Sequence, residues 1–172
     1  MSVQKVDSYK VYRAEIVQKD FDDFRAKRDD IRAAFHCAIS LYHLADWVYQ
    51  AHKAQIDATF TFDANGPQRV TDEKTFPNAL ADINQDFELI RTVANSAKHL
   101  VVTSKSKART LPPHTASNAA NTQMQTSGYG QNFGNNYGGG PRVILEGDGR
   151  ALTEIAESVL KTWDALFKQH GW

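Results

Sequence analysis

The sequence contains one cysteine, Cys37, among its 172 residues. A lone thiol excludes an intramolecular disulfide and a cysteine-rich zinc site, and because Cys37 lies in an apolar stretch we interpret it as buried. No apolar run approaches the roughly 18 residues that span a bilayer. The N-terminal segment MSVQKVDSYK lacks the apolar core of a signal peptide. The sequence therefore predicts a soluble, cytoplasmic protein that does not insert into a membrane.

The chain also lacks an excess of either charge and the short motifs of common cofactor sites. Its 20 basic and 20 acidic residues give a formal net charge of +0, so no global field attracts nucleic acid or a membrane, although a local basic patch is compatible with this balance. The phosphate-loop pattern GxxxxGKS/T, the metalloprotease motif HExxH and the nucleophile elbow GxSxG are all absent. We therefore expect no bound cofactor.

The most apolar stretch runs from Asp30 to His52 and predicts the central helix of a bundle, which we expect to end near Ile56. On a helical wheel its side chains form two apolar faces, one through Leu41 and Leu44 and the other through Tyr42. A helix that is apolar on two sides needs more than one neighbour to cover it. A narrow polar seam is left between the faces, and it carries Arg32, His36, Ser40, His43, Asp46, Trp47 and Gln50.

Three further helices complete the predicted fold. Residues 8–27 follow a mostly helical spacing that three aspartates interrupt, which predicts either one bent helix or two short ones. Apolar residues recur at three- and four-residue steps from Asn78 to Val101, and a further apolar face runs from Arg150 to Gln169. A chain of this length buries one core. We therefore predict a single, mainly α domain over residues 1–172, folded as a four-helix bundle.

Two segments between the helices carry turn and loop signals. Asn65-Gly66-Pro67 predicts a tight turn. Residues 104–140 are rich in Ser, Thr, Asn, Gln and Gly, too polar to offset the entropy of ordering, and they predict a long, flexible, disordered insertion. The segment Pro141–Gly149 predicts a short strand and a turn, which we expect to pair with Leu100–Ser104 as a small β-ribbon flanking that loop.

The first candidate constellation lies in the polar seam of the central helix. His43 and Asp46 are three residues apart, with Trp47 beside them, so their side chains lie near one another. A carboxylate can orient a histidine for proton transfer. Two other interpretations stay open: a structural network in the bundle core, and a metal site that adds His36 and His99.

The second constellation is the segment ANSAKH near the end of the third helix. Arg91, Asn95 and His99 follow one another at four-residue steps, with Lys98 beside them, and therefore lie along one polar face. Arginine holds phosphate through paired hydrogen bonds, histidine transfers protons near neutral pH, and an amide can orient a phosphate or a 2′-hydroxyl. The alternative interpretation is a solvated helix face, whose charges contribute little to stability.

The helical layout and this segment together resemble the HEPN superfamily. In that family a small α-helical bundle carries a polar motif late in a long helix: an arginine, a polar residue that is often asparagine, three residues and a histidine. Asn95 and His99 match the last two positions of the motif, whereas Ala94 occupies the arginine position and Arg91 lies one turn earlier. The stretches LYHLADW and FELIRTVANSAKH also resemble small uncharacterised bacterial and phage-type bundle proteins.

The resemblance implies a homodimer that brings two motifs together across a cleft and cuts RNA without a metal, in a toxin–antitoxin or phage-defence role. In this interpretation His99 transfers protons, Arg91 binds the phosphate and Asn95 positions it. The supporting residues are His43, Asp46, Trp47 and Lys98. The expected partners are RNA, an antitoxin or another protein. Moving the arginine by one turn shifts it about 5 Å along the helix, which bears directly on catalysis.

Some members of the superfamily bind RNA or protein without catalysis. A non-catalytic interaction bundle is therefore our second hypothesis for this chain. A metal-binding bundle, with ligands from His36, His43, Asp46 and His99, is the third. Loss of cleavage in intact His99 and Arg91 variants would separate the first hypothesis from the second, and a metal assay would separate the third from both.

Overall fold

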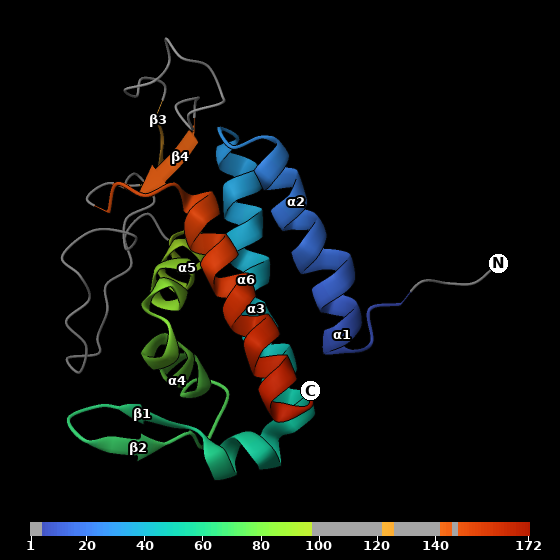
Figure 1. Ribbon diagram of the computed structural model, residues 1–172, viewed down its shortest axis with the longest axis vertical. Helices are drawn as coiled ribbons and strands as arrows, with labels where there is room; N and C mark the ends of the chain where they lie inside the picture. Colours follow the sequence, from blue (N-terminus) through green and yellow to red (C-terminus); the bar gives the residue numbers. More distant parts are fainter. Residues whose placement is uncertain (1–4, 98–121, 126–141, 146–147) are drawn as a thin grey trace.

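A computed structural model of the chain describes residues 5–97, 122–125, 142–145 and 148–172. This part is mainly helical and adds two small antiparallel sheets of two strands each (Figure 1). The prediction of a mainly α bundle with a short β-ribbon is therefore confirmed. The expected disordered insertion at 104–140 lies outside the described residues, except for the four residues 122–125, which form a strand.

The N-terminal helix is continuous but changes its winding once. It consists of α1 (Tyr9–Tyr12), a π-helical turn η1 (Arg13–Val17) and α2 (Gln18–Ala26). Ser8 begins it, because its hydroxyl oxygen accepts a hydrogen bond from the backbone N–H of Val11 at 3.3 Å. The sequence left open one bent helix or two short ones. The structure shows a single continuous helix (Figure 1), with one wide, π-helical turn at Arg13–Val17.

Helix α3 (Ile31–Thr59) forms the centre of the bundle. Its N-terminus is capped by Asp30, whose carboxylate accepts hydrogen bonds from the N–H groups of Arg32 and Ala33 at 2.9 and 3.1 Å. Side chains on both predicted apolar faces are buried, as expected. Cys37 is 1% exposed, and burial raises the pKa of its thiol, so this group is protonated and unreactive at neutral pH.

The predicted third helix is in fact two helices, α4 (Phe76–Ile83) and α5 (Gln85–Ser96). The prediction of one uninterrupted helix was wrong because Asn84 adopts an extended conformation, with φ −145° and ψ 113°. Its side-chain oxygen caps α5, and its amide nitrogen donates hydrogen bonds to the hydroxyls of Ser158 and Thr162 at 3.1 and 2.8 Å. Both the oxygen and the nitrogen of this side-chain amide therefore have hydrogen-bond partners. Residues 98–101 lie outside the described part of the chain.

Helix α6 (Leu152–His170) completes the bundle and lies beside α2, α3 and α5 (Figure 1). Trp163, 1% exposed, is the largest of its fully buried side chains. The rings of Phe76 and Phe87 meet it edge-on, and the ring of Phe167 stacks on it at 5.7 Å. This aromatic centre joins α4, α5 and α6 to the core, and Gly171 ends α6 in the left-handed conformation.

Two β-ribbons extend from the bundle. Strands β1 (Thr61–Asp63) and β2 (Pro67–Arg69) pair across the predicted turn, where Asn65 and Gly66 have positive φ. At the other end, β4 (Arg142–Leu145) pairs with β3 (Thr122–Gln125). The expected pairing with Leu100–Ser104 stays a prediction, because those residues lie outside the described part.

The backbone of α3 bends at His52, which has φ −126° and ψ 24°. The His52 ring stacks on Trp172 at 5.1 Å, with 17° between the planes, and meets the edge of Tyr9 at 5.1 Å. Its Nε2 atom is fully buried and has no hydrogen-bond partner among the described residues. A neutral imidazole tolerates this aromatic site far better than a charged one.

Acidification from pH 7 to pH 5 is therefore expected to destabilise the fold through His52. Burial, and secondarily the charge of Lys10, lowers the pKa of His52 below its ordinary value of 6.5. The unfolded chain then binds this proton at higher pH than the folded chain, so the contribution to stability is complete above pH 6.5 and is lost below it. Thermal unfolding should show a smaller acid-induced drop for His52→Phe than for wild type, and equal drops would contradict this.

Candidate functional site

The centre of the candidate site is the His43–Asp46 pair on α3. Nδ1 of His43 lies 2.9 Å from Oδ2 of Asp46, which is a hydrogen bond that fixes the orientation of the imidazole. The two side chains are 35% and 43% exposed, so both reach solvent. The sequence predicted this pair, and the structure places it at the surface rather than in the bundle core. Nε2 of His43 takes no part in this hydrogen bond.

Tyr42 connects this pair to helix α5. Its ring lies 5.4 Å from the ring of His43 and 6.4 Å from the ring of Phe87 on α5. Burial raises the pKa of the Tyr42 hydroxyl, the charge of Arg91 opposes that rise, and the charges of Asp46 and Glu88 add to it. Charged groups of α3 and α5 therefore surround one phenol. The packing of α3 on α5 thus lets charges from both helices act on Tyr42, which the sequence alone could not establish.

Arg91 is held in place by two neighbours. Its Nη1 donates a hydrogen bond to Oδ1 of Asn78 on α4 at 2.9 Å, and its Nη2 donates to Oε1 of Glu88 at 2.6 Å. Glu88 and Thr92, both on the polar side of α5, are only 8% and 7% exposed. The alternative of a solvated helix face is thus wrong for this part of α5. The guanidinium instead forms a largely buried ion pair with Glu88. The three-residue spacing in the sequence indicates that the two side chains can pair, but it does not indicate that the pair is buried.

The remaining predicted residues divide between described and undescribed parts of the chain. Asn95 lies one turn beyond Arg91 on α5 and is half-buried. His99 and Lys98 lie outside the described residues, so their predicted roles stay predictions. His36 is exposed on α3, two turns before His43. The structure therefore places Tyr42 beside His43, and the charges of Asp46 and Arg91 both affect the pKa of its hydroxyl, while Asn95 lies on the same helix as Arg91.

A second aromatic group flanks the His43–Asp46 pair on its other side. Trp47 stacks on Tyr12 of α1, with ring centroids 5.1 Å apart and 16° between the planes, and both residues are half-buried. Burial, with the charges of Asp20 and then Asp46, raises the pKa of the Tyr12 hydroxyl to about 12. Trp47 was predicted as a supporting residue. Tyr12 and Asp20 were not, because their approach to α3 depends on the π turn and on helix packing.

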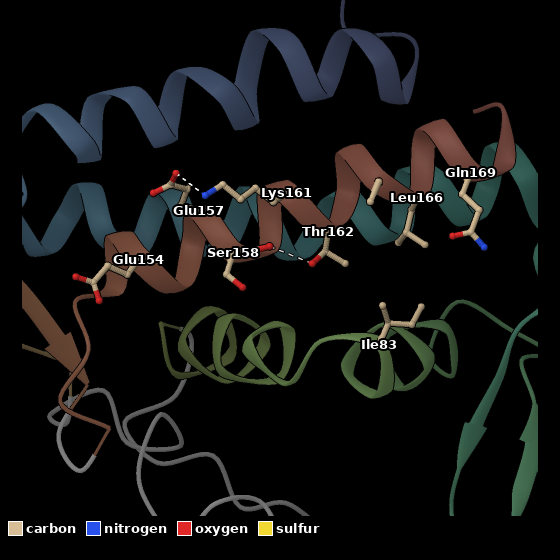
Figure 2. A pocket seen from close by; sticks show the side chains of 9 residues that line it. Ile83, Glu154, Glu157, Ser158, Lys161, Thr162, Leu166 and Gln169 are labelled. Atoms are coloured by element: carbon tan, nitrogen blue, oxygen red, sulfur yellow. Dashed lines mark hydrogen bonds and ion pairs between the residues drawn. The ribbon is translucent and has the colours of Figure 1, made fainter.

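A shallow groove of about 700 Å³ lies elsewhere, between α6 and the end of α4 (Figure 2). Ile83, 51% exposed, points toward α6 from the α4 side, and Ser158, Thr162 and Leu166 form the opposite wall. Both hydroxyls in this wall are already bound by Asn84. None of the predicted site residues lines the groove.

Neither a metal centre nor a membrane span is found in the described part of the chain. Within residues 5–97, 122–125, 142–145 and 148–172, no three His, Cys, Asp or Glu side chains gather closely enough to hold a metal ion. The same residues include no helix with the length and apolar character needed to cross a bilayer. No family model, no curated protein and no solved structure matches the chain.

Proposed function

We propose that this protein acts on RNA and cleaves it without a metal ion, at the face where α3 and α5 meet. The main support is that the His43–Asp46 pair lies beside Tyr42, whose hydroxyl is affected by the charges of both Asp46 and Arg91. A histidine oriented by a carboxylate, with a guanidinium nearby, is a suitable set of groups for phosphodiester chemistry. The resemblance to HEPN bundles supports the same proposal and adds a homodimer and a defence or toxin-type role.

The proposed reaction is attack of an RNA 2′-hydroxyl on the adjacent phosphorus. A base takes the 2′-proton, the bond from phosphorus to the 5′-oxygen breaks, and an acid protonates the leaving oxygen, which yields a 2′,3′-cyclic phosphate and a 5′-hydroxyl. His99 is the proposed proton-transfer group, and the His43–Asp46 pair supports it. Arg91 stabilises the charge on the phosphoryl oxygens and Asn95 orients them. Each of these roles follows from the chemistry of the side chain and can be tested by mutation.

RNA cleavage in EDTA by the pure protein tests this proposal directly. We expect His99→Ala to lose at least about a hundredfold in rate, and His43→Ala to lose rate as well, because acid–base catalysis contributes about 10²–10⁴-fold. His36→Ala is a matched control, since this histidine lies on the same helix as His43 but is exposed two turns away. Oligomer mass and circular dichroism should be recorded for every variant. Equal cleavage by wild type and His99→Ala would overturn the assignment.

A non-catalytic interaction module is the second candidate, and one observation favours it. The guanidinium of Arg91 is already bound by Asn78 and by the buried Glu88, so its charge is largely neutralised within the fold. A site of this kind can serve structure and partner binding without holding a phosphate. Absence of cleavage from a folded dimer, combined with retained RNA or protein binding, would favour this candidate over the nuclease.

A further inference from the structure

The π turn places Tyr12 and Asp20 on the same side of the N-terminal helix. In a regular α-helix, two residues that are eight apart in sequence point in directions that differ by about 80° around the helix axis. A π turn closes a hydrogen bond from residue i+5 to residue i, here from the N–H of Gln18 to the oxygen of Arg13, and so takes up one extra residue. The eight residues from Tyr12 to Asp20 then rotate the chain only as far as seven regular helical residues would, which is within about 20° of two full turns. Tyr12 and Asp20 therefore align, and the charge of Asp20 affects the Tyr12 hydroxyl.

The aligned residues meet α3 at an aromatic and acidic surface. We use the term aromatic–acidic face for the four residues Tyr12, Asp20, Asp46 and Trp47. Two stacked, half-buried rings form its floor, and both carboxylates lie near enough to Tyr12 for their charges to raise the pKa of its hydroxyl. Aromatic rings attract cations through their faces, and carboxylates add to this attraction.

The basic residues closest in sequence are engaged elsewhere. The guanidinium of Arg13 donates hydrogen bonds to Gln18 at 2.8 Å and to Asp164 on α6 at 3.0 Å. Lys19 pairs with Glu15 on the same helix. Among the described residues, no cation of the chain pairs with Asp20. The face thus keeps negative charge beside two half-buried rings, and a cation from outside the chain would complement both.

We propose that the aromatic–acidic face binds an arginine side chain of a protein partner. Arginine fits better than lysine because its planar guanidinium can lie flat on the Trp47 ring while its N–H groups bond to a carboxylate. Asp46 has an oxygen, Oδ1, that His43 does not use, and its side chain is 43% exposed. RNA is disfavoured on this face because two carboxylates would repel its phosphates. The proposal does not depend on RNA cleavage at the α5 side.

Titration of the full chain with an acetylated hexa-arginine amide tests the proposal by NMR. The sequence has three tryptophans, and Trp163 and Trp172 are only 1% and 9% exposed, so we expect the indole N–H signal of Trp47 to move most. Assignment follows from Trp47→Phe. Asp20→Asn and Asp46→Asn should each weaken binding by about threefold to fivefold, in line with exposed charge pairs. The side-chain volumes are preserved, so the fold should be retained.

Glu154→Gln is the matched control, because it removes the same charge from an exposed position on α6, beside the distant groove. Its affinity for hexa-arginine should stay within the error of wild type. Equal weakening by Glu154→Gln and Asp20→Asn would show attraction by net charge alone and overturn the proposal. A shift of the Trp47 signal by single-stranded hexa-uridine, with none by hexa-arginine, would overturn it in favour of RNA binding.

Discussion

Arg91→Ala is expected to lower the free energy of unfolding by about 3 kcal/mol, because removal of one partner leaves a buried charge without its counterion. The carboxylate of Glu88 is 10% exposed as a side chain and is bound by Nη2 of Arg91, and Asn78 also loses a hydrogen bond. Urea unfolding followed by circular dichroism would measure the loss as a lower midpoint at unchanged slope.

The double variant Arg91→Ala/Glu88→Ala separates pairing from packing. It removes the charge that Arg91→Ala would strand, so it should be less destabilised than the sum of the two single variants. Strict additivity would mean that the two residues do not depend on each other. The same experiment matters for function, since loss of RNA cleavage in Arg91→Ala supports the catalytic role only when the fold is shown to be intact. Arg91→Lys, which keeps a charge but not the planar fork, is the better activity variant.

Trp163→Ala is expected to cost about 4 kcal/mol, because it opens a large cavity in the aromatic centre that joins α4, α5 and α6. In a domain of this size such a loss lowers the melting temperature by about 10 °C. Differential scanning calorimetry would record it directly. The effect should be independent of pH between 6 and 8, since the ring carries no titrating group.

Trp163→Phe is the control for the cavity. Nε1 of Trp163 is buried and has no hydrogen-bond partner among the described residues, so exchange of indole for phenyl removes no hydrogen bond there. The cost should be clearly smaller than that of Trp163→Ala, because a phenyl ring leaves a much smaller cavity than a methyl group does. A Phe variant as unstable as Trp163→Ala would show that the indole N–H has a partner after all.

Helical periodicity predicted the bundle because every helix buries a stripe of apolar side chains. It could not locate the break at Asn84, since the apolar spacing continues from Leu80 to Phe87 across it. The signal was an asparagine two residues before an aspartate, a pattern typical of a helix start. The pairing of β3 with β4 joins segments 17 residues apart, from Gln125 to Arg142, and no local pattern in TQMQ indicates it.

The candidate site was predictable where it depends on neighbours along one helix. The His43–Asp46 hydrogen bond follows from a spacing of three residues. The position of Tyr42 between this pair and Arg91 depends instead on how α3 and α5 pack, which a single sequence does not specify. Burial of Glu88 is likewise a tertiary effect, because its place on a polar helix side predicts exposure.

The wide turn at Arg13–Val17 also makes the N-terminal helix one residue longer than regular winding requires. Deletion of one residue there, such as Ala14, would restore regular winding and leave Tyr12 and Asp20 seven residues apart, within about 20° of two full turns. Tyr9 should then still meet His52 while Phe21 and Phe24 keep their places in the core. The N-terminal helix can therefore lose one residue at this turn without changing which of its side chains face α3.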